Sequence, residues 1–359
     1  MAELFKKRLQ NIRKKMKLKN TDAVLITKRE NYMYMSGFTG TSTILFITEG
    51  RAVLLTDFRY VEQASSQAFE YEVIQYTGSF MNELNVLIEK EDIKKLSFED
   101  GHLTYAQYSE YLEKLKVAEF QPLSGAVEEL RRVKDESETA LIKKAVNIAD
   151  GVFTHILGYI KPGVAEIELA AEMEYYMKRQ GALGPSFETI VASGKRASMP
   201  HGVASEKKLE AGDVITMDYG ALYNGYCSDM TRTVFLGKPD RELERIYKIV
   251  LDAQLKGIQA VKQGLTGREV DSIARKVITD SGFGEHFGHG LGHGVGLEIH
   301  EEPMLSIRGN IELNDGMVVT VEPGIYVAGL GGVRIEDMVV VNGDTPAVLT
   351  SSTKEMIIL

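Results

Sequence analysis

At 359 residues the chain is long for a single hydrophobic core, so two domains are expected. Its 44% hydrophobic and 26% charged residues are typical of a globular protein, and its net charge of −9 argues against nucleic acid or an anionic membrane as the main partner. The single cysteine, Cys227, excludes an intramolecular disulfide and fits a reducing compartment. No stretch approaches the ~18 apolar residues of a transmembrane helix, and the first residues lack the apolar core of a signal peptide. We therefore predict a cytoplasmic protein with no membrane partner.

The chain begins with the pattern of a small α/β domain. Residues 4–16 place apolar side chains at helical spacing, with lysines and arginines between them. Three runs of consecutive apolar residues follow, separated by short loop sequences. Such runs are typical of strands that are covered on both faces. The predicted strands are residues 22–27, 41–48 and 51–58.

Two further helical patterns, at residues 60–69 and 105–115, complete this domain. A strongly polar stretch follows at residues 128–137 and indicates a domain boundary. We predict an N-terminal α/β domain of residues 1–128 and a second domain of residues 129–359.

The second domain contains an internal repeat. Aligning Lys161 with Lys262 matches a Lys-x-Gly start, a glutamate seven residues later and a closing glycine suited to a helix C-terminus. A longer helical pattern precedes each copy, at residues 138–160 and 242–261. Each half therefore reads as two helices followed by antiparallel strands. This is an α+β architecture, in which the two halves would close one sheet.

The repeat continues into two hairpins that carry acids. Aligning Leu209 of LEAGDVITMDYG with Leu313 of LNDGMVVTVEPG places Asp218 on Glu322. A second acid follows each copy on an apolar run: Asp229 in YCSDMTRTVFL and Glu336 in GGVRIEDMVVV. Burying an unpaired carboxylate among such residues costs several kcal/mol, so these four acids need cations.

Two arginines and a metal are the candidate cations. Arg232 and Arg334 lie near the acids in sequence but would neutralise only two of the four. Between the hairpins, residues 289–301 read HGLGHGVGLEIHE and hold three histidines. Four carboxylates and an imidazole suit two divalent ions, with Mn²⁺ preferred and Co²⁺, Zn²⁺ and Fe²⁺ as alternatives. Such a pair of ions activates water and polarises a carbonyl, which predicts a hydrolase but selects no substrate.

These motifs resemble those of the pita-bread metallopeptidases, a family that includes prolidases, aminopeptidases P, methionine aminopeptidases and creatinase. The resemblance covers essentially the whole chain and rests on MDYG, SDMTRT, HGLGHGVGLEIHE, TVEPGIY and GGVRIED. In the first domain, ENYMYMSGFTG and LLTDFRY are similar to the creatinase-like domain, which methionine aminopeptidases lack. The resemblance implies a pita-bread fold with a pseudo-two-fold repeat in residues 129–359, preceded by a creatinase-like domain.

The resemblance also implies roles for individual residues. Glu322 would move the proton from water to the leaving nitrogen, His201 and His300 would stabilise the tetrahedral intermediate, and His289 would line the proline pocket. Asp229 and Glu336 would bridge the two ions. The full set of metal ligands would be Asp218, Asp229, His293, Glu322 and Glu336.

Three other residues carry weaker expectations. Arg308 either binds the carboxylate of a dipeptide or is a surface arginine of the SIRGN loop. Arg59 and Tyr60 either reach the site of a neighbouring subunit, since members of the family often form homodimers, or pack at the edge of their own domain. Arg334 is expected to pair with a ligand carboxylate and hold its orientation.

The implied function is an exopeptidase that hydrolyses the Xaa-Pro bond at a free N-terminus. Its substrates would be Xaa-Pro dipeptides, as for a prolidase, or short peptides with proline second, as for an aminopeptidase P; the residues leave both open. The alternatives are a catalytically inactive binding protein on the same fold and a creatinase-like hydrolase that works without metal. Both should have lost acid ligands, which this chain retains.

Overall fold

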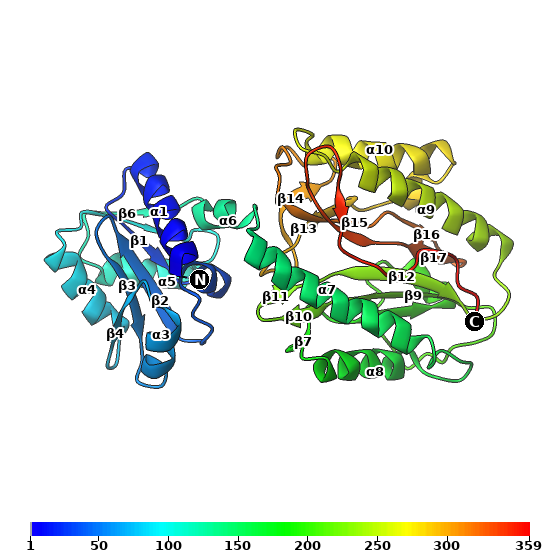
Figure 1. The fold of residues 1–359 in the computed structure, drawn as a ribbon, viewed down its shortest axis with the longest axis horizontal. Coiled ribbons are helices and arrows are strands. Elements are labelled where there is room, and N and C mark those ends of the chain that lie inside the picture. The colour runs from blue at the N-terminus through cyan, green and yellow to red at the C-terminus, as the bar shows by residue number, and fades with distance from the viewer. Residues whose placement is uncertain (1) are drawn as a thin grey trace. The chain divides into compact units, whose positions relative to one another are not determined.

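A mixed six-stranded sheet forms the centre of the N-terminal unit in this computed structural model, which describes residues 2–359 (Figure 1). Its strands β1 (Ala23–Ile26), β2 (Thr43–Thr48) and β3 (Ala52–Thr56) are buried along their whole length, because their apolar side chains point to both covered faces. They confirm the three strands predicted from the apolar runs. The strand order is β4 (Glu72–Gln75), β3 (Ala52–Thr56), β2 (Thr43–Thr48), β1 (Ala23–Ile26), β5 (Lys95–Phe98) and β6 (Glu119–Pro122).

Six helices belong to the described part of this unit. The predicted helices at 4–16, 60–69 and 105–115 correspond to α1, α3 and α5, whereas α2, α4 and α6 were not predicted. The chain forms two compact units that meet in sequence after Arg131, and each unit has its own core. The helices are α1 (Ala2–Lys19), α2 (Arg29–Ser36), α3 (Val61–Gln67), α4 (Phe80–Lys90), α5 (Tyr105–Lys114) and α6 (Ala126–Arg131).

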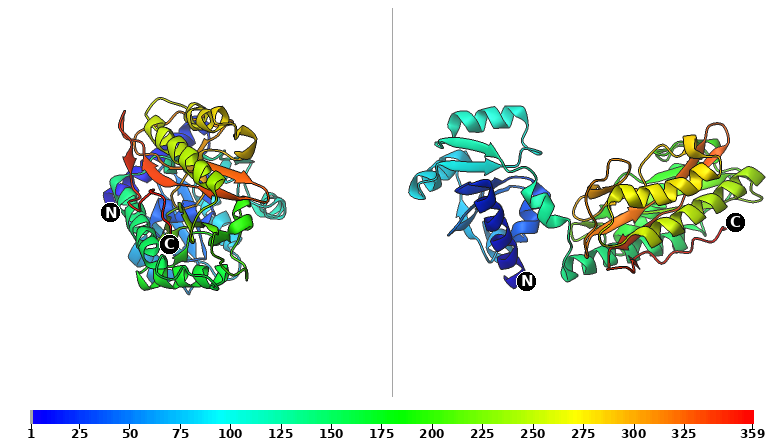
Figure 2. Two further views of the ribbon diagram at one scale, coloured as in Figure 1. Left: turned by 90° about the vertical axis from the view of Figure 1, so that its right-hand side faces the viewer. Right: turned by 90° about the horizontal axis from the view of Figure 1, so that it is seen from above.

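The C-terminal unit places helices on two sides of its strands. Helices α7 (Glu136–Ile156) and α8 (Glu166–Arg179) lie on one side, and α9 (Arg241–Ala260) and α10 (Gly267–Asp280) lie on the other (Figures 1 and 2). One core joins α7 and α8 to the first hairpin, and a second core joins α9 and α10 to the second hairpin. The two predicted helical pairs are therefore confirmed.

Two hairpins carry the repeat. Strand β9 (Val214–Tyr219) pairs antiparallel with β12 (Met230–Phe235), and β15 (Val318–Val321) pairs antiparallel with β18 (Asp337–Val340). The other strands are β7 (Gly184–Pro185), β8 (Ile190–Ser193), β10 (Ala221–Tyr223), β11 (Tyr226–Cys227), β13 (Gly292–Gly294), β14 (Glu301–Leu305), β16 (Gly324–Val327), β17 (Gly331–Arg334) and β19 (Ala347–Val348).

Backbone contacts repeat along with the hairpins. The amide of Glu166 donates to Lys207 O at 3.0 Å, and the amide of Gly267, its counterpart in the repeat, donates to Ile311 O at 3.2 Å. In both halves, a backbone hydrogen bond thus joins the N-terminus of the second helix to the segment that leads into the first strand of the hairpin. Residues 2–359 contain no helix with both the length and the apolar character needed to cross a bilayer.

Candidate active site

The ends of the hairpin strands bring the acids together. Asp218 lies on β9, and Asp229 comes directly before β12. Glu322 comes directly after β15, and Glu336 comes directly before β18. The amide of Glu336 donates to Thr231 O at 3.1 Å, so a backbone hydrogen bond joins the two hairpins where their acids lie.

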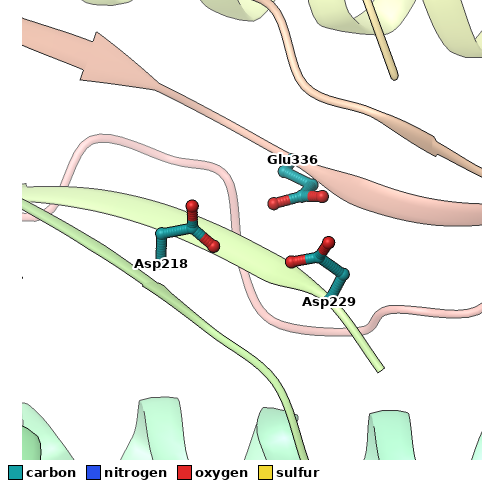
Figure 3. A group of neighbouring side chains, drawn as sticks. All are labelled: Asp218, Asp229 and Glu336. Atoms are coloured by element: carbon teal, nitrogen blue, oxygen red, sulfur yellow. The ribbon is translucent and has the colours of Figure 1, made fainter. Parts of the chain in front are cut away.

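Three of the carboxylates face one another in the middle of the unit. One oxygen from each of Asp218, Asp229 and Glu336 lies within 4.8 Å of the others, and Figure 3 shows the three groups turned toward a common space. His293 Nε2 lies 3.6 Å from Asp229 Oδ2 and 3.3 Å from Glu322 Oε1. The structure therefore brings all five side chains that the sequence singled out as metal ligands into one group.

The electrostatics of this group call for a cation. Burial raises the pKa of Asp229 far above that of an ordinary aspartate, and the charges of Glu336 and Asp218 raise it further. Burial likewise raises the pKa of Glu336, as do the charges of Glu322 and Asp218. Burial also raises the pKa of Asp218, although the charge of Arg334 opposes the shift. These carboxylates would lose their protons readily only beside added positive charge.

Two orphaned oxygens show where that charge would lie. Asp218 Oδ1 and Glu336 Oε1 are buried and have no hydrogen-bond partner within the described part of the chain. A buried acceptor without a partner is costly, and carboxylate oxygens are the ligands that hard divalent cations prefer. The donor set of four carboxylates and an imidazole thus fits divalent metal ions.

Glu322 differs from the other acids. Its burial opposes ionisation, but the hydrogen bond and the charge of His293 lower the pKa of Glu322 to about 2. The same contact raises the pKa of His293 against the effect of burial. Glu322 is consequently the acid of this group that is held ionised by the protein alone.

Arg334 holds the carboxylate of Asp218 on the first hairpin. This buried arginine donates from Nη2 to Asp218 Oδ2 at 2.6 Å and from Nε to Thr231 Oγ1 at 3.0 Å. Its Nη1 donates to Tyr326 Oη at 2.7 Å, and Tyr326 Oη lies 2.9 Å from His289 Nε2. Arg334 thus pairs with a carboxylate of this group, as predicted. Sequence reasoning missed Tyr326, whose only signal was its place in the TVEPGIY motif.

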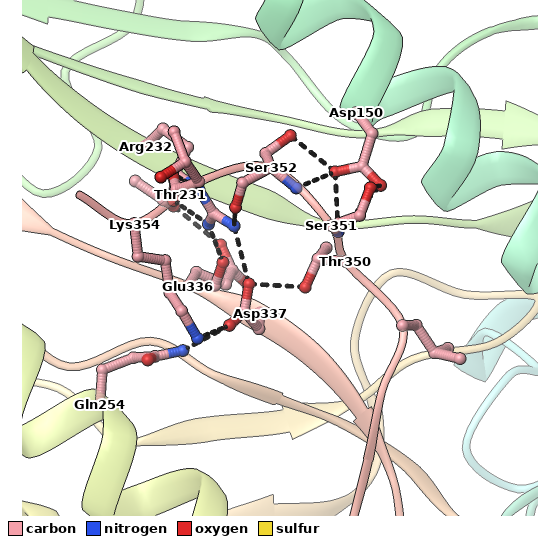
Figure 4. A network of polar contacts seen from close by, with 12 residues as sticks. Asp150, Thr231, Arg232, Gln254, Glu336, Asp337, Thr350, Ser351, Ser352 and Lys354 are labelled. Carbon is pink, nitrogen blue, oxygen red and sulfur yellow. Dashed lines mark hydrogen bonds and ion pairs between the residues drawn. The ribbon is translucent and has the colours of Figure 1, made fainter. Parts of the chain in front are cut away.

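Arg232, the other arginine considered as a cation for the acids, faces away from them. Its Nη2 donates to Asp337 Oδ1 at 2.8 Å, and its Nη1 donates to the backbone oxygens of Thr231 and Glu336 (Figure 4). Successive side chains of a strand point to opposite faces, so the side chain of Asp337 points away from that of Glu336. Arg232 pairs with Asp337 and therefore lies on that other face. The expectation that Arg232 could neutralise one of the four acids is therefore wrong.

Asp337 also anchors the C-terminal segment behind the acids. It accepts hydrogen bonds from Thr350 Oγ1 at 2.6 Å and Gln254 Nε2 at 2.9 Å, and it pairs with Lys354 (Figure 4). Arg232 adds a bond from Nη2 to Ser352 O at 2.8 Å. This polar network fixes the backbone of Glu336 from the side that faces away from the acid group.

A cavity of about 190 Å³ opens beside the acids and collects the predicted histidines. His293 and His300 pack with ring centroids 4.4 Å apart, and burial lowers the pKa of His300 and of His289. His201 is exposed at the edge of the cavity. The lining consists of Pro200, His201, Asp218, His289, Gly290, Gly292, His293, His300, Glu322 and Arg334.

The weaker candidates lie elsewhere. Arg308 is exposed on the segment after β14 and is not among the described residues that line the cavity. In the N-terminal unit, Arg59 pairs with Asp57 at 2.7 Å, and Tyr60 Oη lies 2.7 Å from Thr41 Oγ1. Their own unit therefore supplies partners for both residues.

A buried group of carboxylates with one histidine, in a repeated hairpin fold that follows a small α/β unit along the chain, defines a two-domain metal-dependent hydrolase. Residues 140–343 match the model of metallopeptidase family M24, and residues 8–133 match that of the creatinase/prolidase N-terminal domain. The chain belongs to metallopeptidase family M24, and the family resemblance and the two-part fold read from the sequence are confirmed.

Several known proteins are similar over their whole length. The solved structure of a Xaa-Pro dipeptidase from Bacillus anthracis is 50% identical with a TM-score of 0.97, covering 99% of this chain and 100% of that one. A Xaa-Pro dipeptidase from Pyrococcus horikoshii is 39% identical over 357 residues, covering 99% and 100%. The structure of an X-Pro aminopeptidase from Thermotoga maritima is 39% identical with a TM-score of 0.91, covering 96% and 100%.

Proposed function

We propose that this protein is a Xaa-Pro dipeptidase that works with two divalent metal ions, Mn²⁺ in the first place. The observation that carries the proposal is the convergence of four carboxylates and His293 beside a cavity that three further histidines line. The likeness to two proteins named Xaa-Pro dipeptidases supports the substrate class. The cavity of about 190 Å³ is smaller than the ~300–1,000 Å³ of pockets for drug-sized ligands, which favours a dipeptide.

Asp218, Asp229, His293, Glu322 and Glu336 would hold the ions, with Asp229 and Glu336 in the shared positions that the family resemblance implies. When bound, two divalent ions lower the pKa of a water molecule and polarise the scissile carbonyl. The protein's own residues would supply the proton transfers and the positioning.

Glu322 would act as the general base and then as the acid. Its pKa of about 2 keeps it ionised at neutral pH, so it can accept a proton from the attacking water. It would then deliver this proton to the proline nitrogen, which must leave as a secondary amine. His201 and His300 would donate hydrogen bonds to the developing oxyanion, and a lowered pKa keeps His300 a neutral donor.

The substrate's two ends would be recognised by different groups. His289, held by Tyr326, would line the side of the cavity that receives proline. Arg308 remains our candidate for the terminal carboxylate of a dipeptide, and Arg308→Met should then raise KM for Ala-Pro without changing kcat.

We further propose a cytoplasmic homodimer in which Arg59 and Tyr60 reach the partner's site, which light scattering and Arg59→Ala kinetics would test.

An aminopeptidase that accepts longer peptides is the second candidate, which the likeness to the X-Pro aminopeptidase from Thermotoga maritima favours. Metal-stripped protein, with and without Mn²⁺, would be given Ala-Pro and Ala-Pro-Ala, and alanine release would be followed. Mn²⁺-dependent cleavage of Ala-Pro alone is expected. Equal cleavage of the tripeptide would make the protein an aminopeptidase. No cleavage of either with Mn²⁺, Co²⁺, Zn²⁺ or Fe²⁺ would contradict both.

A further inference from the structure

The loop that carries His201 is built separately from the strands that carry the acids. It leaves β8 at Ser193, starts with a short 3-10 helix at Gly194–Ser198 and passes Pro200 and His201 before returning toward β9. Pro200 and His201 line one edge of the cavity, whereas the acids lie on β9 or directly beside β12, β15 and β18. The position of His201 therefore depends on whatever fastens this loop.

One buried carboxylate fastens both ends of the loop. Glu166, the first residue of α8, is fully buried. Its Oε1 accepts hydrogen bonds from the backbone N and the Oγ of Ser193, both at 2.7 Å. Its Oε2 accepts from the backbone N of Ser205 at 3.2 Å and from Ser205 Oγ at 2.7 Å, and it pairs with the guanidinium of Arg196. Glu166 thus holds the residue before the loop, one within it and one after its tip.

The partners of Glu166 brace the tip as well. Arg196 Nη2 donates to Val203 O at 2.8 Å, across the stretch that contains His201. Gly202 packs so closely on β8 that a Cβ there would lie 2.9 Å from Ala192 Cβ. The tip is therefore held both by the hydrogen bond from Arg196, the partner of Glu166, and by the packing of Gly202 on β8.

The second half of the repeat does without this carboxylate. The counterpart of Glu166 is Gly267, and a Cβ on Gly267 would lie 2.0 Å from Met304 O, so backbone packs there directly. The second half therefore forms the same fold without a glutamate at this position. The glutamate occurs in the half whose loop places His201 at the cavity.

We propose that Glu166 is a positioning residue that acts through His201: by holding Ser193, Arg196 and Ser205 it fixes the loop so that His201 faces the substrate. The inference rests on the proposed function, because it takes His201 as a donor to the substrate carbonyl. A displacement of about 1 Å at a reacting group can cost ~100-fold in rate, so a loosened loop should slow the reaction while leaving the metal ligands in place.

The first experiment measures the loop itself. Hydrogen exchange followed by mass spectrometry on Glu166→Gln is expected to show at least tenfold faster exchange in peptides spanning residues 193–205, and unchanged exchange in β9 and β15. Glu206→Gln removes an exposed carboxylate of the same loop and serves as the matched control, with wild-type exchange expected. Unchanged exchange in Glu166→Gln would overturn the proposal.

The second experiment asks whether the effect passes through His201. Glu166→Gln should lower kcat for Ala-Pro about tenfold with little change in KM, and His201→Ala should lower it about 100-fold. The double variant should be no slower than His201→Ala alone, because Glu166 then has no histidine to position. A further tenfold loss in the double variant would mean that Glu166 acts elsewhere and would overturn the proposal.

Two controls separate this proposal from its foundations. Calorimetric titration with Mn²⁺ alone should give the wild-type affinity for Glu166→Gln, and a tenfold weaker affinity would contradict a role through the loop. Ser205→Ala removes one donor and keeps the carboxylate, so it should give a smaller loss of the same kind even if Glu166→Gln folds poorly. If the wild-type protein cleaves no Xaa-Pro peptide, the proposed function fails, and hydrogen exchange still decides whether Glu166 holds the loop.

Discussion

The two halves of the C-terminal unit share a backbone plan but give equivalent carboxylates opposite properties. Asp218 and Glu322 occupy matching places in the two hairpins, yet burial raises the pKa of Asp218 while His293 lowers that of Glu322 to about 2. Asp218 contacts Arg334, which holds it in one orientation, whereas Glu322 contacts an imidazole at 3.3 Å. The repeat therefore supplies the positions of the acids, and their neighbours decide which one has a lowered pKa.

The first test of this comparison changes the two matched acids separately. Glu322→Gln should lower kcat by ~10²–10⁴-fold, because it removes the group that moves the proton. Asp218→Asn should mainly weaken Mn²⁺ binding, so that excess Mn²⁺ recovers most of kcat. Steady-state kinetics over a range of Mn²⁺ concentrations separates the two effects. Equal recovery of both variants would mean that the hairpins are equivalent after all.

The second test uses the acids that face each other across the two halves. Asp229→Asn should lower the activity by more than the ~10–100-fold that is typical of losing a group that only supports a metal ligand. Its effect on the metal-free protein should have the opposite sign. The raised pKa of Asp229 means that the fold disfavours its charged form, so a neutral side chain should raise the Tm of the stripped protein.

Thermal unfolding with and without Mn²⁺ checks this reversal, and Asp252→Asn on the exposed face of α9 is the control. A lower Tm for stripped Asp229→Asn than for the stripped wild type would contradict the electrostatic account of the acid group.

The third test concerns a position where the halves differ in polarity. Arg232 of β12 and Asp337 of β18 occupy equivalent positions, because they lie opposite the matched residues Met217 and Val321. Asp337 pairs with Arg232 and Lys354, whereas buried Met230 is apolar. Asp337→Asn should lower the free energy of unfolding by about 3–5 kcal/mol, since it leaves Arg232 buried without its anion. Met230→Leu should cost less than about 1.5 kcal/mol. Urea unfolding of the stripped protein measures both, and equal losses would mean that Asp337 is held by packing alone.

The smallest effect is expected where the second half needs no side chain. Gly267→Ala places a Cβ 2.0 Å from Met304 O, so the start of α10 must shift, at a cost of about 1–3 kcal/mol. Ala165→Gly, next to the matching position at the start of α8, provides a control of similar size. Differential scanning calorimetry checks the shift in Tm. A Gly267→Ala variant as stable as the wild type would mean that the close approach of backbone is not required.

Much of this architecture could be read from local patterns. The apolar runs that became β1, β2 and β3 are recognisable because strands buried on both faces carry little else. Glycine-rich β13 was not predicted as a strand, because glycine and histidine have little strand preference and its pairing with β14 and β15 supplies the order. Elements held mainly by partners distant in sequence leave weak local signals.

The candidate site likewise has features that local sequence patterns predict and features that depend on distant partners. The sequence by itself determined the repeat, the paired acids and the histidine motif, because matching spacings in two copies imply matching backbone positions. Only the tertiary structure decided that Arg334 rather than Arg232 faces the acids, that Asp337 turns away from them, and that Glu166 holds the His201 loop. These side chains meet partners far away along the chain, so their contacts depend on how strands and helices pack and not on local spacing.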